Sequence, residues 1–271
     1  MRRDLGASVK GGGEKGGESR RRILDAALSE FAAKGLAGSR TEAIATAAGV
    51  NKALLYYYFA SKEELYVAAL EMISERVRDT TMAVFMREGS AGEKVLRSAL
   101  SHFDRILVQQ EFQSLMQQEM IRMHKGESGA LPILIKRVFE PLLIMFRSMV
   151  REGIASGELI DADWQQIQLA ALGANVLYFL SAPVWRIVMG TEPMSLEALT
   201  ERRRLLLEFL GQAIFRDRQR GGEVAAKVLA DAPIGDVGSP FPNRGSTWAA
   251  QAPEDAAGPG MWNDGSKGRT E

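Results

Sequence analysis

Residues 39–65 read SRTEAIATAAGVNKALLYYYFASKEEL, and this stretch carries the clearest structural signals in the chain. Ser39 and Glu42 have the spacing of a capping box, which predicts that a helix begins there. Asn51 is a favourable N-cap residue, so a second short helix is expected directly after it. Gly49 lies between the two helices and allows a tight turn of the backbone. The stretch therefore predicts a helix-turn-helix motif.

Three consecutive tyrosines, Tyr56, Tyr57 and Tyr58, occupy the second of these helices. Residues four apart share a helix face, so Lys52 and Tyr56 lie together while Leu55 takes the core face. If all three phenols were core residues, three hydroxyls would need buried hydrogen-bond partners. We therefore favour a docking surface, in which the rings pack against a groove and the hydroxyls donate to phosphates.

Charge is distributed unevenly along the chain, although its 34 basic and 34 acidic residues give a formal net charge of zero. Residues 19–62 include seven basic and three acidic side chains, a net charge of +4. Residues 221–271 include four basic and seven acidic side chains, a net charge of −3. The basic N-terminal region indicates a nucleic-acid partner more clearly than the overall charge does.

Helical spacing recurs along the rest of the chain, and no run alternates apolar and polar residues for long enough to predict a strand. The expected fold class is all-α. A helix over residues 20–34, ended by Gly35, precedes the motif, and Ser61 with Glu64 begins a long helix after it. Pro141 is expected to kink or divide the segment that contains it. The later helices are expected over residues 92–107, 109–125, 130–156, 163–189 and 195–217.

Residues 20–65 resemble the DNA-binding domain of the TetR family of bacterial transcriptional regulators. The segments ILDAALSEFAAKG, IA..AGV, LYYYF and SKEEL occur in the family's order and register. The resemblance implies an N-terminal three-helix helix-turn-helix domain followed by a larger helical ligand-binding and dimerisation domain. The expected regions are a disordered N-terminal extension (1–18), the helix-turn-helix DNA-binding domain (19–65), a helical effector-binding and dimerisation domain (66–220) and a disordered C-terminal tail (221–271).

The resemblance assigns DNA contacts to both helices of the motif. The first helix would meet the phosphate backbone at its start, Lys52 and the next two residues would reach base edges, and the tyrosines would contact phosphates and sugars. Asn51, Ala53 and Leu54 stand where the family frequently has serine, glycine and threonine. The two apolar side chains suit thymine methyl groups, so an unusual operator is expected. The DNA-binding residues implied are Ser39, Arg40, Thr41, Asn51, Lys52, Ala53, Leu54, Tyr56, Tyr57, Tyr58 and Lys62.

Members of the family are homodimers in which the last two helices pair with their copies. Residues 164–179 and the leucine run 205–207 belong to helices that are apolar on more than one face, which suits burial against a second subunit. Burial within one subunit alone is the alternative. A homodimer would carry two motifs about a two-fold axis and read a palindromic operator. The arginine run 202–204 is interpreted as a solvated face rather than a second nucleic-acid site.

Methionine and phenylalanine recur at helical spacing in the middle of the chain. Plain core packing is the simpler interpretation of Met116, Met120 and Met123. The resemblance instead implies a cavity for an apolar or amphipathic small molecule that controls DNA binding. His102 and His124 do not form a metal-ligand pair, but with Arg105, Glu119 and Arg122 they could orient a polar group on such a molecule. The expected pocket residues are Phe103, Leu107, Phe112, Met116, Met120, Met123, Phe146, Met149 and Tyr178.

Other classes of function lack the residues that they need. The chain has no cysteine and two separated histidines, so we expect neither an enzyme nor a cofactor nor a metal site. We find no apolar run of about 18 residues and no signal-peptide core, so a cytoplasmic location is expected. The predicted function is a repressor that an apolar or amphipathic effector releases from a palindromic operator. The alternative is a helix-turn-helix protein that binds double-stranded DNA without a small-molecule ligand.

Overall fold

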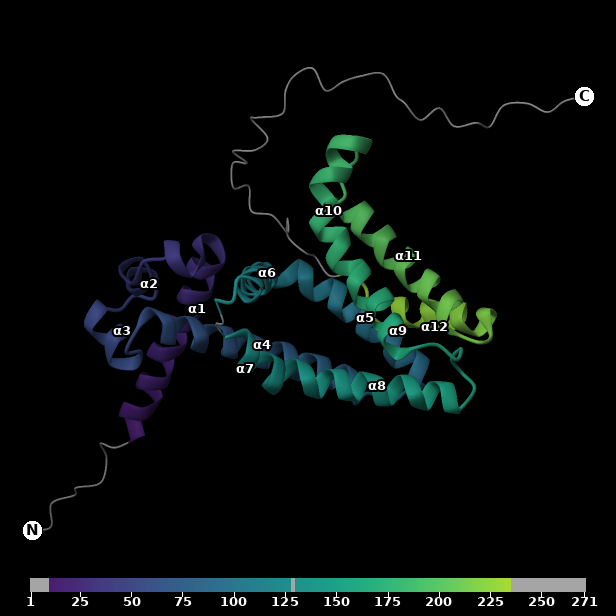
Figure 1. Cartoon of the computed structure of the whole chain (residues 1–271), viewed down its shortest axis with the longest axis horizontal. Helices are drawn as coiled ribbons and strands as arrows, with labels where there is room; N and C mark the ends of the chain where they lie inside the picture. Colours follow the sequence, from purple (N-terminus) through teal and green to yellow (C-terminus); the bar gives the residue numbers. More distant parts are fainter. Residues whose placement is uncertain (1–9, 128–129, 235–271) are drawn as a thin grey trace, which may run out of the picture. The chain divides into compact units, whose positions relative to one another are not determined.

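Helices make up the structure, a computed structural model that describes residues 10–127 and 130–234, with side chains from residue 16 onward. No strand occurs in these ranges, where an isolated β-bridge joins Leu159 to Phe215. The predicted all-α class is confirmed. Figure 1 shows α1 (Lys10–Gly38), α2 (Thr41–Ala47) and α3 (Lys52–Tyr58) grouped together, followed by the long α4 (Lys62–Phe85).

The remaining described segments are also helical, and two of them, η1 and η2, are π-helical. In chain order they are α5 (Ala91–Val108), α6 (Gln110–His124), α7 (Leu131–Leu134), η1 (Ile135–Phe139), α8 (Glu140–Ala155), α9 (Trp164–Gln168), η2 (Leu169–Gly173), α10 (Ala174–Met189), α11 (Leu196–Ile214) and α12 (Arg218–Ala230).

The first helix is longer than predicted. It begins at Lys10 rather than near Arg20, so the disordered extension predicted over residues 1–18 is wrong from residue 10 onward. Residues 1–9 lie outside the described ranges. The glycines of KGGGEKGGES, residues 10–19, each disfavour a helix by about 1 kcal/mol relative to alanine, which is why the composition predicted no helix there. The predicted stop is confirmed, because Gly35 has a φ of 69° and a ψ of 173° and breaks the helix there.

The helix-turn-helix motif is present between α2 and α3. Asn51 is the N-cap of α3, as predicted, and its side-chain oxygen accepts a 2.7 Å hydrogen bond from the backbone N–H of Leu54. Gly49 has a φ of 64°, in the left-handed region that favours glycine. This conformation turns the chain between the two helices.

The capping box predicted for Ser39 and Glu42 is wrong. Arg40 is the N-cap of α2, and its side chain makes no capping hydrogen bond. The Ser39 hydroxyl lies 2.6 Å from the backbone oxygen of Gly35 and 3.1 Å from that of Glu30, and donates to this pair. The serine hydroxyl therefore donates to carbonyl groups at the C-terminal end of α1, which lack partners within the helix.

Ser61 and Glu64 form the predicted capping box at the start of α4. The Ser61 hydroxyl accepts a 3.0 Å hydrogen bond from the backbone N–H of Glu64. The Glu64 carboxylate accepts one of 2.7 Å from the backbone N–H of Ala60. These bonds fix the point at which the long helix leaves α3.

The hydrophobic core around the motif extends past residue 65, the predicted end of the DNA-binding domain. α1 packs against both α4 and α6, so the motif and the following helices share one core. Its buried members beyond that boundary are Tyr66, Ala69, Leu70, Ile73, Val77, Phe112, Leu115, Met116, Ala130, Leu131 and Leu134.

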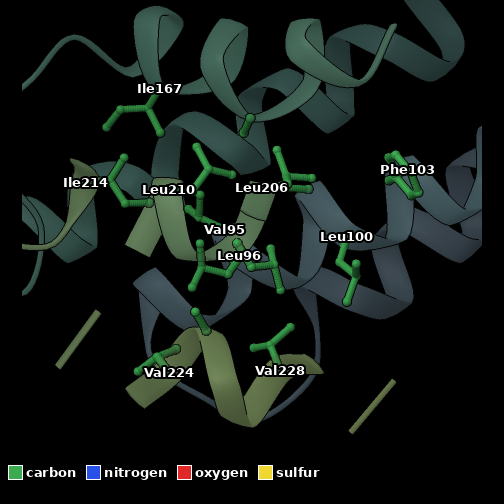
Figure 2. Packing of buried hydrophobic residues seen from close by; sticks show 14 of the residues in the cluster. Val95, Leu96, Leu100, Phe103, Ile167, Leu206, Leu210, Ile214, Val224 and Val228 are labelled. Atoms are coloured by element: carbon green, nitrogen blue, oxygen red, sulfur yellow. The ribbon is translucent and has the colours of Figure 1, made fainter. Parts of the chain in front are cut away.

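A second hydrophobic core lies among α5, α8, α11 and α12. Figure 2 shows Val224 and Val228 of α12 on the side of the core that holds Val95 and Leu96 of α5. All four side chains are buried. The disordered tail predicted over residues 221–271 is therefore wrong for α12, which is part of this core.

Glycines explain why α12 was not expected. Gly221 and Gly222 read as helix breakers, but Gly221 allows close contact between α11 and α12. A Cβ atom on Gly211 would lie 2.5 Å from the backbone oxygen of Gly221, so a larger residue would separate the two helices. The rest of the predicted tail, from residue 235, lies outside the described ranges.

The predicted break near Pro141 is present. Pro141 lies in the first turn of α8, and the π-helical η1 directly precedes α8. The helix expected over residues 163–189 is likewise divided, into α9, η2 and α10. Asp163 caps its start by accepting a 2.9 Å hydrogen bond from the N–H of Gln165. π-Helical segments are frequent at functional sites.

One stretch is long and apolar enough to span a membrane, contrary to the expectation from the sequence. Trp164–Met189 contains an 18-residue window with a mean hydropathy of 1.5, and 22% of that window is buried. Length and composition alone do not distinguish a membrane span from an apolar helix that packs against another protein.

Candidate DNA-binding interface

The exposed side of α3 presents the tyrosines that were predicted to dock on DNA. Leu55 and Phe59 are 0% and 1% exposed, so one face of the helix is fixed to the core. Tyr57 is 80% exposed and Tyr56 is 42% exposed. The rings of these two tyrosines thus remain at the surface, whereas Tyr58 is partly buried.

The residues predicted to read bases lie at the start of α3. Lys52 and Ala53 are exposed and Leu54 is partly buried. Asn51 is exposed too, but its side-chain oxygen is engaged as the N-cap. The structure therefore brings this part of the predicted site together on one short helix.

Thr41 of α2 and Tyr56 of α3 are joined by a hydrogen bond of 3.2 Å between their hydroxyl oxygens. The ammonium of Lys52 lies 5.7 Å from the centre of the Tyr56 ring. Three predicted DNA contacts from two helices therefore form one group. Thr41 is only 7% exposed, so its hydrogen bond serves to fix the relative position of the two helices.

Lys52 also forms an ion pair with Glu42 of α2. The hydrogen bond from Lys52 holds the pKa of Glu42 below its ordinary value. The same hydrogen bond raises the pKa of Lys52. Both groups are therefore charged at neutral pH, and a phosphate that approaches Lys52 must compete with Glu42.

Two of the predicted contact residues are engaged with the end of α1. Ser39 is 4% exposed, so its side chain is not at the surface. The Lys62 ammonium donates to the backbone oxygens of Ser39 (3.2 Å) and Ala37 (3.4 Å). Arg40 is exposed, and its guanidinium makes no hydrogen bond or ion pair to another described residue. Arg40 is thus the more available cation beside α2.

The start of α1 lies beside the end of α3, which the sequence did not predict. The Arg20 guanidinium lies 5.3 Å from the centre of the Phe59 ring. A Cβ atom on Gly16 would lie 3.3 Å from the Tyr58 hydroxyl. Tyr58 in turn meets Tyr57 edge-on, with ring centres 5.2 Å apart. The helical spacing of α1 predicts its apolar face, but not this contact.

The nine predicted pocket residues do not form one cluster. Phe103, Leu107, Phe146 and Met149 are buried in the second core, and Tyr178 packs against it. The ring centres of Phe103 and Tyr178 are 5.9 Å apart. These five residues remain candidates for contact with an effector.

The other four predicted pocket residues lie elsewhere. Phe112 and Met116 belong to the core around the motif. Met120 and Met123 are 54% and 49% exposed, because their side of α6 is not covered. Helical spacing indicates which residues share a face of α6, but it does not indicate which other helix packs against that face.

A polar cluster lies between α5 and α10, and we define it by His102, Arg105 and Asn175. The Asn175 amide nitrogen donates to the backbone oxygen of Ala99 (2.8 Å) and lies 3.4 Å from Nδ1 of His102. The Arg105 guanidinium donates a 2.9 Å hydrogen bond to the hydroxyl of Thr81 in α4. The cluster thus contacts residues of three helices, α4, α5 and α10.

Burial controls the ionisation of this cluster. It lowers the pKa of His102 to about 3, and the nearby positive charge of Arg105 acts in the same direction. Burial also lowers the pKa of Arg105, to about 10. At neutral pH His102 is therefore neutral and Arg105 is a cation. The sequence indicated both residues but missed Asn175, the single amide in the apolar run LAALGANVLYFL over residues 169–180.

Glu119 and Arg122 form a network with Tyr66 of α4. The Tyr66 hydroxyl and the Arg122 guanidinium donate to the same Glu119 oxygen, at 2.8 and 2.7 Å. The other Glu119 oxygen accepts from the N–H of Leu131 at 3.3 Å. The Tyr66 ring meets Phe31 of α1 edge-on, with ring centres 5.0 Å apart. These residues connect α6 to the helices of the motif rather than to the polar cluster.

The arginine run 202–204 is not one solvated face. Arg203 is 3% exposed and forms two hydrogen bonds of 2.8 Å with the Asp104 carboxylate. The Arg202 guanidinium lies 5.2 Å from the centre of the Tyr178 ring. Only Arg204, which pairs with glutamates of its own helix, matches the interpretation from the sequence.

A surface cleft of about 530 Å³ is lined by residues of α1 and α4. Its charged lining residues are Arg20, Arg21, Glu71, Glu75 and Arg76. None of the nine predicted pocket residues lines it. Over residues 10–127 and 130–234, no three His, Cys, Asp or Glu side chains converge as a metal site would require.

The motif and its exposed tyrosines define the class of protein, a helix-turn-helix protein of the DNA-binding type. Residues 23–69 match the family model described as bacterial regulatory proteins, tetR family. This region of the chain is therefore similar to the N-terminal, DNA-binding domain of TetR-family regulators.

Curated relatives match over short stretches of the chain. RutR of Escherichia coli is 55% identical over 51 residues, which are 19% of this chain and 24% of RutR. The repressor NicS of Pseudomonas putida is 46% identical over 55 residues, 20% of this chain and 26% of NicS. YdgC of Bacillus subtilis is 34% identical over 86 residues, 32% of this chain and 44% of YdgC. In each case the matched region spans less than half of the relative's length.

Solved structures share the fold over more of the chain. A transcriptional regulator from Saccharomonospora viridis, solved with choline, has a TM-score of 0.58 and 20% identity over 74% of this chain and 100% of that one. A γ-butyrolactone receptor has a TM-score of 0.57 and 21% identity, over 80% of this chain and 100% of the receptor chain. FadR of Bacillus subtilis, solved with stearoyl-CoA, has a TM-score of 0.53 and 20% identity over 70% and 96%. Identity at this level shows a common fold alone.

Proposed function

We propose that the protein is a transcriptional regulator that binds double-stranded DNA through α3 and the start of α2. The observation that carries this proposal is the 80% exposure of Tyr57 on a short helix that Leu55 and Phe59 fix to the core. An exposed aromatic residue on a rigid helix, beside the cations Arg40 and Lys52, suits the sugar-phosphate backbone. The match to the family model supports the same function.

The predicted contact residues take different roles in this proposal. Lys52, Ala53 and Leu54 approach base edges in the major groove, because they occupy the start of the recognition helix. Arg40 and Tyr57 contact phosphates. The remaining predicted residues position these groups, through the hydrogen bonds of Ser39, Thr41, Asn51, Tyr56 and Lys62 and the ring contact of Tyr58.

The proposed regulator is a homodimer that reads a palindromic operator. On α10, Leu177, Leu180 and Val184 recur at helical spacing and are 65%, 51% and 57% exposed. On α11, Leu205 and Phe209 are 44% and 66% exposed. Apolar side chains exposed in a row indicate a protein–protein contact. Burial against a second copy would account for the apolar character of the stretch that contains α10.

An apolar or amphipathic effector is proposed to release the regulator, a repressor, from DNA through α6. The Ser114 hydroxyl of α6 donates a 3.0 Å hydrogen bond to the backbone oxygen of Ala32 in α1. Glu119, also on α6, is bonded to Tyr66 of α4. A shift of α6 would therefore move both helices and change the separation of the two motifs in a dimer. The neighbours solved with choline and stearoyl-CoA support small-molecule control.

The alternative is a DNA-binding protein of the same fold without an effector. Nothing in the motif distinguishes the two, because the motif serves DNA binding in both. The polar cluster favours the first, since an unpartnered buried amide oxygen at Asn175 is unusual in a core that binds nothing. In either case we propose a cytoplasmic protein that is not an enzyme.

Selection of bound sequences from a pool of random duplexes tests the function. We expect enrichment of a palindrome whose half-sites lie about one helical turn apart, or a multiple of that. A Lys52→Ala, Tyr57→Ala double variant that remains folded should fail to enrich it. Recovery of no sequence by the wild-type protein, or equal enrichment by the variant, would contradict the proposal.

A further inference from the structure

We propose that the polar cluster of His102, Arg105 and Asn175 binds the carboxylate of an amphipathic effector and an adjacent hydrogen-bond donor of the same molecule. The inference rests on the proposed function, because it names the chemical class of the effector proposed there. Three features of the cluster lead to it.

Arg105 is a cation that no described Asp or Glu neutralises. Its guanidinium donates to the neutral hydroxyl of Thr81 at 2.9 Å and forms no ion pair with a described Asp or Glu. The carboxylate of Asp104, the preceding residue, is bonded to Arg203 instead. A largely buried guanidinium without a counterion is unfavourable, and a ligand carboxylate would supply the missing charge.

His102 provides a second donor to the same anion. The amide nitrogen of Asn175 is a donor, because it bonds the backbone oxygen of Ala99 at 2.8 Å. The second N–H of this amide is shared between the backbone oxygen of Ala171 (3.3 Å) and Nδ1 of His102 (3.4 Å). A ring nitrogen that faces an amide N–H carries no proton, which puts the proton of the neutral ring on Nε2. An N–H group at Nε2 and the Arg105 guanidinium together suit the two oxygens of a carboxylate.

Asn175 identifies the other half of the ligand. Its residue exposure is 0%, and its amide oxygen has no hydrogen-bond partner among the described residues. Such an oxygen requires a donor, so a hydroxyl or amide N–H next to the carboxylate would satisfy it. The π-helical η2 ends two residues before Asn175 and packs against α5, the helix of His102 and Arg105. A break in regular helix geometry at this point is consistent with a binding site.

Aromatic side chains supply the apolar surface that an amphipathic ligand needs. Phe103 is 0% exposed, and its ring centre lies 5.9 Å from that of Tyr178 and 5.0 Å from that of Phe179. The charge of Arg105 would repel a quaternary ammonium group. The cluster therefore selects against choline, the ligand of one structural neighbour.

Thermal unfolding with amphiphiles of equal chain length tests the inference. The probes are decanoate, β-hydroxydecanoate, decanol and decyltrimethylammonium, each below its micelle-forming concentration. We expect the two carboxylates to raise the unfolding temperature in a concentration-dependent way and to bind at least about tenfold more tightly than decanol or the ammonium probe. β-Hydroxydecanoate should bind more tightly than decanoate. No carboxylate binding, or equal binding of the four head groups, would overturn the inference.

Variants separate the two halves of the site. Arg105→Met should remove the preference for carboxylates, whereas Arg204→Met, at an exposed arginine, should keep it. Asn175→Leu should remove only the advantage of β-hydroxydecanoate. If Arg105→Met does not fold, Arg105→Gln replaces it, since the amide keeps a donor but removes the charge. Carboxylate preference that persists in a folded Arg105 variant would overturn the assignment.

DNA binding without any probe distinguishes this inference from the proposed function. The wild-type protein and Arg105→Met should bind the selected duplex equally well. Failure of both to bind any duplex would count against the regulator itself. Intact DNA binding without head-group discrimination would count against the carboxylate site alone.

Discussion

The hydroxyl of Tyr66 donates a 2.8 Å hydrogen bond to the carboxylate of Glu119, and both residues are buried. Tyr66 lies on α4, which follows directly from the recognition helix, and Glu119 lies on α6. Burial, together with the hydrogen bond to Glu119, raises the pKa of Tyr66, so the phenol remains protonated and keeps donating at physiological pH. This bond joins the helix that follows the motif to the helix proposed to transmit the effector signal.

Replacement of Tyr66 by Phe tests the contribution of this bond. The change keeps the ring but removes one donor to a buried carboxylate, so the free energy of unfolding should fall by about 1–3 kcal/mol. Urea denaturation followed by circular dichroism measures it. The matched control is Tyr57→Phe, at an 80% exposed ring, which should leave stability unchanged. Equal stability of the two variants would show that the Tyr66–Glu119 bond is not stabilising.

His102 should make stability depend on pH. Its folded-state pKa of about 3 lies below the ordinary value of 6.5, so the unfolded chain takes up a proton first as the pH falls. Ionisation of His102 therefore leaves the free energy of unfolding unaffected above pH 6.5, and this free energy decreases as the pH falls from 6.5 toward 3. Between about pH 7.5 and about pH 5.5, the wild-type protein should lose about 1.4 kcal/mol more than His102→Gln. Parallel pH profiles for the two proteins would contradict a buried neutral His102.

The Lys52–Glu42 ion pair should moderate DNA binding. Lys52→Ala should weaken binding and reduce the salt dependence by about one ion. Glu42→Gln should have the opposite effect at low salt, strengthening binding by a few-fold, because the phosphate no longer competes with a carboxylate. Fluorescence anisotropy over a series of salt concentrations measures both. A loss of affinity in Glu42→Gln, with the fold intact, would show that the pair positions Lys52 instead of masking it.

Charges on the exposed faces of α10 and α11 should separate the proposed dimer. Leu177→Glu and Phe209→Glu alter side chains that are 65% and 66% exposed, so each subunit should fold and sediment as a monomer. Leu206 is 2% exposed, and Leu206→Glu should unfold the subunit instead. Analytical ultracentrifugation and circular dichroism distinguish these outcomes. Intact dimers in both exposed-site variants would move the interface elsewhere.

Local signals in the sequence predicted the motif well. Asn51 caps α3 and Ser61 caps α4, because each satisfies N–H groups within its own helix. Ser39 misled the prediction, since its hydroxyl bonds the preceding helix rather than the following one. Spacing alone cannot distinguish these two uses of a serine. Gly221 misled the prediction as well. It permits close packing against Gly211 on another helix, and its own sequence neighbours do not reveal this contact.

Tertiary partners explain what the sequence could not predict of the sites. Met116 and Met120 are one helical turn apart on α6, yet one is 5% and the other 54% exposed, because only one contacts a neighbouring helix. Arg203 lies between two other arginines in the sequence, so nothing local marks it as buried. Its ion pair with Asp104, which is distant in the sequence, is what allows the charge to be buried. Asn175 carried a usable signal, a lone amide in an apolar helix, but its partners on α5 appear only in the fold.

If α3 and the start of α2 form the DNA-binding face, exposed side chains on these two helices control the affinity for DNA. The wild-type protein and an Arg40→Ala, Lys52→Ala, Tyr57→Ala variant are titrated against the selected palindrome at fixed salt. All three side chains are exposed, so the variant should fold as the wild type does. We expect its affinity to fall by at least about a hundredfold, to the level of an unrelated duplex. Wild-type affinity in a folded triple variant would contradict the account.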